Sequence, residues 1–421
     1  MFELAGRERP ADLHDREQFD PHRPFIDEFT WECAACREAG RSGTFRRVED
    51  VIDAWFDSGA MPFAQHHYLG EALADFDPAH LPRRGFPAHF IAEAIDQTRG
   101  WFYTLHVLGV LLFRSAAYKN CIVLGHVNDE QGRKMSKRLG NFVEPDTVIE
   151  ETGADALRWY FCINDPEQNS RFSARLVREA AQGFLIPLWN ALSFFTIYAN
   201  LDGWHPGRAA ALAIADRAWL DQWILLRLDD LVEGVGNCLD GYAVAEAARL
   251  IVKFSDDLTN WYIRRSRDRF WAENPESADK EAACQTLYGV LTTLSRLVAP
   301  FTPFVAEVLH GNLERSQRET AASSVHLDAW PGKQGVEDQL EEGEDLELLY
   351  GMNVVQRVVA LGRAARNAHG LKTRQPLASV TLVAASSVAE KDFRPRVERF
   401  ADLIQDELNV KQIRWAADRT E

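Results

Sequence analysis

The sequence predicts a multidomain protein in which an α/β part with a parallel sheet is followed by an all-α bundle and then by a small α/β part. Three observations support this. A strand, a helix and a second strand follow one another between residues 89 and 124. Long amphipathic segments with short breaks fill residues 171 to about 315, and helix and strand patterns alternate after residue 345. A chain of 421 residues is too long for one compact core, so two to three domains are expected.

The net charge limits the kinds of partner. The chain has 47 Lys and Arg against 63 Asp and Glu, a formal net charge of −16. A chain this acidic does not bind nucleic acid indiscriminately, so an RNA partner must meet a local basic patch.

No run of about 18 apolar residues occurs, and Met1-Phe2-Glu3 does not begin a signal peptide. We therefore expect a soluble, cytoplasmic protein with no membrane partner.

Residues 1 to about 30 are polar, punctuated by proline and without clear periodicity, and they predict an extended connection. After them, Cys33 and Cys36 have the spacing of zinc ligands. A structural zinc site needs four ligands, and no second C-x-x-C occurs in this sequence, so a pair of free thiols is the alternative. The other four cysteines lie in apolar segments, as expected of small buried side chains.

The first strand–helix–strand unit lies within residues 49–165. Residues 89–92 are predicted to form a buried strand, 93–98 a turn, 99–117 a helix and 120–124 a second strand. Such a unit forms a parallel sheet with a right-handed crossover, and the carboxyl ends of its strands face the ligand crevice. We expect this edge to gather the polar and aromatic residues Glu93, Asp96, Gln97, Trp55, Trp101 and His126, and the lysine loop that follows them.

Each of these residues has a structural alternative. Trp101 opens an apolar helix and could be a core residue, and Glu93 could be a solvated turn residue. Trp55 belongs to a short apolar run, residues 51–59, that ends in a polar turn. Their convergence on one edge, more than any single residue, favours a ligand site.

The lysine loop spans residues 132–141 and is bounded by glycine. Lys134 and Lys137 lie three positions apart in it. An ammonium group on a flexible stem can follow a pyrophosphate group as charge develops on it during a reaction. The loop therefore suits a polyphosphate ligand; the alternative is a solvated surface loop without a ligand.

The helical part covers residues 166–330. Its amphipathic segments are 174–199, 216–239, 242–272 and 278–298. In the third segment, residues at steps of three and four share one helix face, which predicts a packed bundle. These residues are Ala247, Leu250, Phe254, Leu258 and Trp261.

The stretch from Trp261 to Trp271 concentrates four arginines against one acid. Arginine beside aromatic residues suits phosphate contacts and base stacking, so Trp261, Arg264, Arg265 and Arg267 are candidates for RNA contact. The equally weighted alternative is a bundle helix whose aromatics pack inward while its arginines pair with acids.

The last part, residues 331–421, follows a polar, acidic linker. A helix is predicted over 345–368, a strand over 377–384, a helix over about 389–408 and a strand over 410–416.

Several motifs in this sequence resemble those of class I aminoacyl-tRNA synthetases, and most closely their isoleucyl branch. Residues 134–137 are similar to the KMSKS signature, with Arg138 in place of the final serine. Residues 53–59 resemble D-x-W-F-D-S-G, and residues 93–102 match E-G-x-D-Q-x-R-G-W-F with Ala94 in place of glycine. The resemblance continues downstream in Gly153–Arg158, Trp261–Arg265, Ala299–Phe304 and Glu407–Lys411, and covers about residues 20–421.

The resemblance implies a domain order. Residues 1–48 would be the return connection from an editing insertion and carry the C-x-x-C half-site. Residues 49–165 would be the second half of a Rossmann-type catalytic sheet with the KMSKS-like loop, and 166–330 an all-α anticodon-binding bundle. Residues 331–421 would be a small, truncated α/β C-terminal junction domain.

The resemblance also implies ATP-dependent ligation of isoleucine to tRNA(Ile) through isoleucyl-adenylate, with Mg²⁺. Lys134 and Lys137 would be catalytic and would stabilise the pyrophosphate side of ATP. The amino-acid pocket would be formed by Trp55, Asp57 and Trp101. The nucleotide and adenylate would be bound by Glu93, Asp96, Gln97, His126, Met135, Ser136 and Lys137.

The family's first signature, H-x-G-H, does not occur in this sequence. We therefore expect the chain alone to be incomplete and inactive, and the complete enzyme to be a monomer. Two alternatives remain. One is a non-catalytic tRNA-binding fragment, and the other is a valyl or leucyl relative, because a difference of one methylene discriminates between substrates by only about 1–3 kcal/mol.

Overall fold

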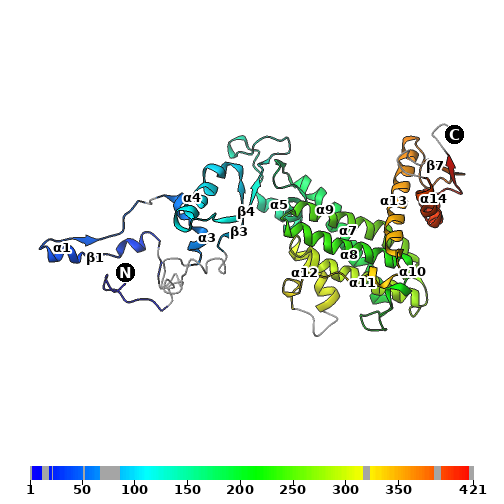
Figure 1. Ribbon diagram of the computed structural model, residues 1–421, viewed down its shortest axis with the longest axis horizontal. Helices are drawn as coiled ribbons and strands as arrows, with labels where there is room; N and C mark the ends of the chain where they lie inside the picture. Colours follow the sequence, from blue (N-terminus) through cyan, green and yellow to red (C-terminus); the bar gives the residue numbers. More distant parts are fainter. Residues whose placement is uncertain are drawn as a thin grey trace. The chain divides into compact units, whose positions relative to one another are not determined.

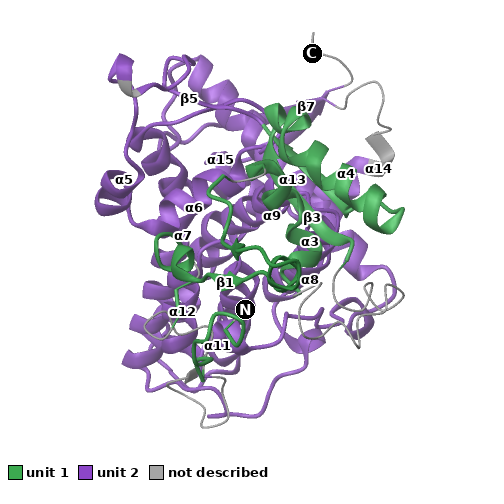
Figure 2. Ribbon diagram, turned by 90° about the vertical axis from the view of Figure 1, so that its left-hand side faces the viewer, with its two compact units in different colours: residues 1–124 green, residues 125–421 purple. Residues whose placement is uncertain are grey.

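The computed structural model of the protein describes residues 2–11, 19–20, 22–50, 53–66, 86–315, 323–383 and 390–416. The chain divides into two compact units, Met1–Leu124 and Gly125–Glu421, which Figure 2 colours green and purple. This division falls inside the predicted range 49–165. The domain ranges given above remain predictions.

The segment around the two cysteines of unit 1 is folded. It contains η1 (Phe25–Glu28), β1 (Trp31–Glu32), α1 (Ala34–Glu38) and β2 (Thr44–Phe45). The two strands pair antiparallel, and the rings of Trp31 and Phe45 stack with their centroids 5.8 Å apart. Only η1 falls within residues 1 to about 30, where an extended connection is predicted, and there the chain forms a 3-10 turn. After it, the strand pairing and the aromatic pair fix the chain locally.

The sheet of unit 1 confirms the predicted strand–helix–strand unit. β3 (Ala88–Ala94) and β4 (Tyr118–Leu124) run parallel, with Ala88 opposite Tyr118 and Ala94 opposite Leu124. Between them lie the 3-10 turn η4 (Ile95–Arg99) and α4 (Trp101–Phe113). Glu93 belongs to the end of β3 and not to the turn, because pairing with Val123 extends the strand beyond the predicted boundary.

Two short helices precede this sheet, α2 (Ala54–Gly59) and α3 (Met61–Ala64). The prediction of a polar turn at the end of residues 51–59 is wrong, because α2 extends from Ala54 to Gly59. The Asp53 carboxylate accepts a hydrogen bond from the backbone N–H of Trp55 at 3.0 Å, which is the N-cap interaction that starts a helix. The unit's core contains Phe63, Phe86, Ile91, Phe102, Leu105 and Leu108.

Unit 2 begins with a short parallel pair, β5 (Val127–Asn128) and β6 (Ser170–Arg171). The loop between them contains η5 (Lys137–Leu139), α5 (Pro145–Thr152) and α6 (Ala154–Ile163). Gly153 separates the two α-helices, because its φ of 87° is not helical. Residues with a side chain rarely adopt this angle, so the position favours glycine.

The bundle contains α7 (Ala174–Leu201), η6 (Ile214–Asp216), α8 (Trp219–Asp240), α9 (Val244–Asp256), α11 (Ala278–Val298) and α12 (Pro303–His310), and Figure 1 shows its long helices side by side. The predicted helix 242–272 is interrupted. A π-helical segment, η7 (Asp257–Ile263), separates α9 from α10 (Arg264–Trp271), and a second one, η8 (Gly311–Arg315), follows α12. The predicted apolar face is confirmed, because four of its residues are buried and Leu250 is half-buried.

One helix in the part of the chain that the structure describes, α7, is long and apolar enough to cross a membrane by length and composition. The same helix contributes Phe184, Leu188, Leu192 and Phe195 to the core of the bundle. A core helix of a bundle passes this test as readily as a membrane span does, so the absence of a membrane partner stays a prediction.

The C-terminal part begins with η9 (Val325–Leu327) and η10 (Glu337–Gln339). It continues with α13 (Glu344–Ala368), β7 (Val380–Val383), α14 (Glu390–Arg399), α15 (Ala401–Leu408) and β8 (Ile413–Ala416). The two strands pair parallel. The helix predicted over about 389–408 is two helices, divided at Phe400, whose backbone leaves the helical conformation. Residues 384 and 389 lie outside the described residues.

Candidate functional site

Two tryptophans and one glutamine lie together in unit 1. The Trp101 indole Nε1 donates a hydrogen bond to the carbonyl of Ser58 at 2.9 Å, which ties the start of α4 to α2. The Trp55 ring lies against Gly100, where an added Cβ would be 3.2 Å from ring atom Cη2. Trp55 is 45% exposed and Trp101 is half-buried, so both indoles remain accessible in this unit.

Gln97 fixes the beginning of α4. Its side-chain Oε1 accepts a hydrogen bond from the backbone N–H of Trp101 at 2.8 Å, so it satisfies a donor that the helix itself leaves unpaired. A Cβ at Gly100 would lie 2.5 Å from this oxygen, so a side chain at this position would displace the Gln97 side chain from the start of α4. The side-chain carbonyl of Gln97 is thus hydrogen-bonded to the first residue of α4.

The other predicted residues of unit 1 are exposed. Glu93 lies at the end of β3, Asp96 follows in η4, and Asp57 lies on α2. The Asp96 carboxylate is 3.5 Å from the Gln97 side-chain nitrogen. Unit 1 therefore brings Trp55, Gln97 and Trp101 together, while the three carboxylates face solvent.

The lysine loop of unit 2 is organised by a buried carboxylate, that of Asp129. Asp129 is 5% exposed and accepts hydrogen bonds from the backbone N–H groups of Gln131 and Arg133, at 3.1 and 2.7 Å. It also accepts from Arg133 Nε at 2.8 Å and from the Asn141 side chain at 2.9 Å. The Asn141 hydrogen bond is the main cause that lowers the pKa of Asp129 from 3.8 to about 2, and the contacts with Arg133 add to it.

Asn141 closes the loop from its other end. Its side-chain Oδ1 accepts from the Ser136 N–H at 2.9 Å, and its Nδ2 donates to the Lys134 carbonyl at 3.2 Å as well as to Asp129. Lys134 is exposed, and Met135 packs against the cluster that contains Tyr160 and Phe172. The backbone of the loop is therefore held while the Lys134 side chain faces solvent.

Sequence reasoning missed Asp129 and Asn141. Asp129 precedes the loop and Asn141 is its last residue. The signal that could have identified them is Gly132, whose φ of 83° closes the tight turn after Asp129. His126, which was predicted as a nucleotide-binding residue, is exposed in the same unit, and its backbone N–H donates to the Asn169 side chain at 2.8 Å.

Two of the motifs quoted above meet in unit 2. The Asp155 carboxylate accepts hydrogen bonds from the N–H groups of Phe304 and Val305, at 3.4 and 2.6 Å, and so caps α12. Arg158 donates to the carbonyls of Pro300 and Phe301, at 2.8 and 3.2 Å. Burial raises the pKa of Asp155, although the two N–H groups oppose this shift. These contacts join α6 to the turn before α12.

Cys33 and Cys36 are half-buried free thiols at the start of α1. Hydrogen bonds from the backbone and the side chain of Cys36 lower the pKa of Cys33, while the same side-chain contact raises the pKa of Cys36. Two thiols are half of a structural zinc site, and the described residues contain no group of three or more His, Cys, Asp and Glu residues that could hold a metal. Zinc binding stays a prediction.

The arginine-rich stretch follows the inward-packing alternative in several respects. Trp261 is 7% exposed within the bundle core, which does not fit the prediction that it stacks on RNA. Arg269 donates to both carboxylate oxygens of Asp221, at 2.9 and 2.7 Å. Arg264 and Arg265 contact acids of α15, and Arg267 is exposed. RNA contact by these three arginines stays a prediction.

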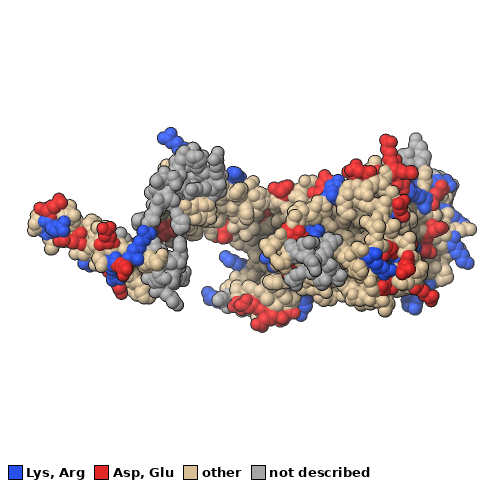
Figure 3. All heavy atoms as spheres, turned by 90° about the horizontal axis from the view of Figure 1, so that it is seen from below, with Lys and Arg blue, Asp and Glu red and all other residues tan. Residues whose placement is uncertain are grey.

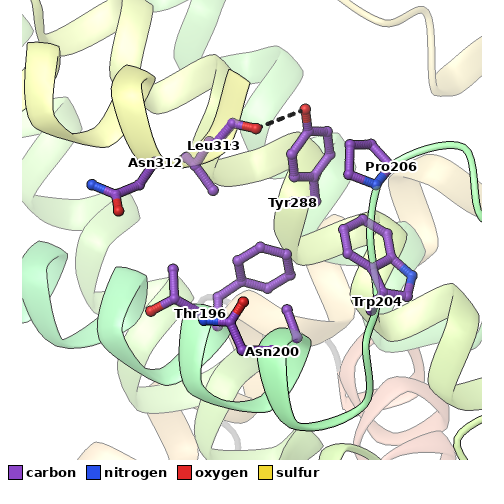
Figure 4. Close-up of a pocket in the computed structure, with 9 residues that line it drawn as sticks. Thr196, Asn200, Trp204, Pro206, Tyr288, Asn312 and Leu313 are labelled. Atoms are coloured by element: carbon purple, nitrogen blue, oxygen red, sulfur yellow. Dashed lines mark hydrogen bonds between the residues drawn. The ribbon is translucent and has the colours of Figure 1, made fainter. Parts of the chain in front are cut away.

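The bundle also contains a small pocket that sequence reasoning missed, shown in Figure 4. Its walls include Trp204 and Tyr288, and Asn200 and Asn312 contribute amides to its lining. Tyr288 Oη donates to the Leu313 carbonyl at 3.3 Å. The cavity has a volume of about 40 Å³, which is room for small groups only.

Among the described residues on the face shown in Figure 3, charged side chains are mixed in sign and form no broad basic field. A nucleic-acid contact on such a surface depends on local groups of cations, as the net charge of −16 also requires.

Comparisons with known proteins agree with this layout. Residues 11–173 match the family described as "tRNA synthetases class I (I, L, M and V)", and residues 221–382 match the "Anticodon-binding domain of tRNA ligase". The chain is 46% identical over 400 residues to an isoleucine–tRNA ligase of Thermus thermophilus, covering 94% of this chain and 36% of that protein. It is 45% identical over 426 residues to one of Deinococcus radiodurans, covering 100% and 36%. The chain thus spans a little over a third of the length of these relatives.

Solved structures show a similar fold. A complex of LeuRS, tRNA and LeuAMS from Agrobacterium radiobacter K84 matches with a TM-score of 0.54 at 17% identity, covering 89% of this chain and 42% of that one. Methionyl-tRNA synthetase of Mycobacterium tuberculosis, bound to methionyl-adenylate, matches with a TM-score of 0.50 at 20% identity, covering 70% and 59%. The matches to the family models, in this order along the chain, show that it carries the catalytic-region and anticodon-binding domains of the class I tRNA synthetases.

Proposed function

We propose that the chain is part of an enzyme that ligates isoleucine to tRNA(Ile), with ATP and Mg²⁺, through isoleucyl-adenylate. The observation that carries the proposal is the 46% identity over 400 residues to an isoleucine–tRNA ligase. In the reaction, a carboxylate oxygen of isoleucine attacks the α-phosphorus of ATP, and the bond to the leaving pyrophosphate breaks. A terminal ribose hydroxyl of tRNA then attacks the acyl carbon, and AMP leaves.

Residues 49–165 are the second half of a Rossmann-type catalytic domain, and within them Trp55 and Trp101 form walls of the isoleucine pocket. The hydrogen bond from Trp101 to Ser58 and the cap by Gln97 hold the second indole in place. Flat apolar walls suit an aliphatic side chain, and exposed Asp57 lies on the same helix as Trp55. Glu93 and Asp96 bind the adenylate, with Glu93 toward its ribose, and Gln97 contributes its side-chain amide.

In unit 2, Lys134 and Lys137 stabilise the charge that develops on pyrophosphate. Met135, Ser136 and His126 belong to the nucleotide site. Asp129 and Asn141 act as positioning residues, because they bind the backbone of the loop and leave the exposed Lys134 side chain free to reach a ligand. Mg²⁺ that accompanies ATP supplies further neutralisation of the phosphate charge.

The helical bundle binds tRNA, as supported by the match of residues 221–382 to an anticodon-binding domain. The α/β segment after it is a C-terminal junction domain. We further propose a cytoplasmic enzyme that acts as a monomer when complete and has no membrane partner.

Amino-acid-dependent exchange between ATP and pyrophosphate tests the proposal. The chain would be assayed together with the H-x-G-H region that the family resemblance implies. Isoleucine should support faster exchange than valine or leucine, and Lys137→Ala should reduce the rate about 100-fold, as expected when a group that stabilises transition-state charge is lost. A preference for valine or leucine would contradict the isoleucine assignment and favour a relative of that kind.

A second candidate function is a tRNA-binding chain without catalysis. The anticodon-binding match and the absence of H-x-G-H from this sequence favour it. It predicts tRNA binding by the chain with no exchange activity in the supplemented assay, whereas isoleucine-dependent exchange would exclude it.

A further inference from the structure

The Glu407-Leu408-Asn409-Val410-Lys411 motif has no role in the reaction described above, yet its first residue organises three arginines. The Glu407 side chain is 0% exposed and lies on α15. Its Oε2 accepts from Arg363 of α13 at 2.5 Å, and its Oε1 accepts from Arg264 of α10. Arg265 lies 3.6 Å from the same Oε1 and donates to Asp406 at 3.1 Å. One buried carboxylate thus joins three helices. We name Arg264, Arg265 and Arg363 the arginine cluster.

The arginine cluster carries more positive charge than its acids neutralise. Three guanidinium groups face two carboxylates, and one of these, Asp406, has a side chain that is 66% exposed and therefore contributes a weak ion pair. Arg267, one turn along α10 from Arg264, is exposed and forms no ion pair with the described residues. The single acid of α10, Asp268, is exposed and likewise makes no ion pair within the described ranges.

The arginine cluster also has unused hydrogen-bond donors. A guanidinium has five N–H donors. Toward described residues, Arg363 donates one hydrogen bond, Arg265 one, and Arg264 two, the second to the carbonyl of Asn260 at 2.8 Å. Their side chains are 47%, 29% and 37% exposed, so each guanidinium keeps a solvent-accessible part.

Arg366, one turn further along α13 than Arg363, shows what a purely structural arginine looks like in this protein. It is 4% exposed, and it donates four hydrogen bonds, to the carbonyls of Lys372, Gln375, Leu408 and Asn409, at 2.6 to 3.1 Å. Arg366 is buried, and backbone carbonyls occupy its donors. The guanidinium groups of the arginine cluster are partly exposed and keep unused donors, so they can bind a further anion.

We propose that Arg264, Arg265 and Arg363, oriented by Glu407, bind a phosphate group of the RNA backbone. The buried carboxylate restricts the guanidinium groups before the ligand arrives, which reduces the entropy lost on binding. Arginine forks match phosphate oxygens and form charge-assisted hydrogen bonds with them. The inference rests on the proposed tRNA partner and adds to it a site that spans the bundle and the C-terminal part of unit 2.

The test measures the affinity of the 421-residue chain for a fluorescent tRNA(Ile) transcript over a series of salt concentrations. Arg363→Gln should raise Kd about ten-fold near 0.1 M salt, through the loss of a charge-assisted contact. It should also reduce the slope of log K against log salt by about 0.7 to 0.9, the value of one phosphate contact. Arg357→Gln is the matched control, because Arg357 is exposed on the same helix and makes no ion pair with the described residues.

A second variant keeps the test independent of folding defects. Arg363→Lys retains a positive charge for Glu407, so it should keep the salt slope of the unsubstituted chain while losing affinity with the planar fork. If the unsubstituted chain binds tRNA and Arg363→Gln changes Kd and slope no more than Arg357→Gln does, the arginine cluster is only a strut between helices and the inference is wrong. If the unsubstituted chain binds no tRNA, the proposed tRNA partner fails and this site fails with it.

Discussion

Asp129 and Glu407 are both carboxylates that unit 2 buries next to cationic residues, yet they are satisfied by different groups. Asp129 accepts from backbone N–H groups, an arginine and an asparagine amide, so it fixes the path of a loop. Glu407 accepts from arginine side chains, so it fixes the guanidinium groups themselves. The comparison suggests that a buried acid can prepare cations for a ligand in two ways. It can hold the backbone and leave the side chain mobile, or it can hold the side chain directly.

The largest effect on the free energy of unfolding should come from the buried ion pairs of Glu407. Glu407→Gln removes the charge that three arginines share, and we expect the free energy of unfolding to fall by about 2–3 kcal/mol. Breaking a fully buried pair typically costs about 3–5 kcal/mol, and the value here is lower because the arginines stay partly solvated. Urea unfolding followed by tryptophan fluorescence measures it. An unchanged midpoint would show that Glu407 does not hold the arginine cluster.

The corresponding change in the loop should have a local effect. In Asp129→Asn the new amide can accept fewer hydrogen bonds, and its NH₂ faces the NH₂ group of Asn141. We expect the N–H groups of Arg133 and Ser136 to exchange with solvent about ten-fold faster, while the bundle amides keep their rates. Glu144→Gln is the control, because that side chain is exposed and makes no cap hydrogen bond. Equal exchange in both variants would contradict the role given to Asp129.

Acid should loosen the loop in a defined interval. The pKa of Asp129 is lowered from 3.8 to about 2 in the folded protein, so its stabilising contribution is complete above pH about 4. The contribution decreases as the pH falls from about 4 to about 2, and it is lost below pH about 2. Amide exchange of the loop, compared between the natural chain and Asp129→Asn at pH 5 and pH 3, measures this. A difference between the two proteins that is as large at pH 3 as at pH 5 would argue against it.

The smallest effect on the free energy of unfolding should come from Asp406, the exposed acid beside the arginine cluster. Asp406→Asn removes an ion pair in which the acid is 66% exposed, so the free energy of unfolding should change by about 0–1 kcal/mol. The same urea experiment measures it beside Glu407→Gln. A loss as large as that of Glu407→Gln would mean that burial does not distinguish the two acids.

Local patterns in the sequence predicted much of the fold. The alternation of strand, helix and strand gave β3, α4 and β4, and the apolar spacing from Ala247 to Trp261 gave the buried face of the bundle. The π-helical break at Asp257–Ile263 was not predicted, because the apolar spacing continues through it. The hairpin between Trp31 and Phe45 was missed because its strands are only two residues long.

The candidate site was predicted in part. Trp55, Gln97 and Trp101 were named from the sequence and lie together, since they flank one helix start. Asp129 and Asn141 were missed because they act on backbone groups, which leave no periodic pattern. The contacts of Arg264 and Arg363 with Glu407 were missed for another reason. Glu407 lies 143 and 44 positions away from them along the chain, and no local spacing encodes such a contact.

We propose that the buried Asp129 carboxylate positions the lysine loop for pyrophosphate chemistry. Isoleucine-dependent exchange of ATP with pyrophosphate, assayed with the H-x-G-H region present, tests it directly by comparing Asp129→Asn with Glu144→Gln. We predict that Asp129→Asn lowers kcat about ten-fold or more and leaves KM for isoleucine unchanged, because the loop acts on the phosphate side of the reaction. Equal kcat values for the two variants, or an absence of isoleucine-dependent exchange in the natural protein, would contradict this role of Asp129.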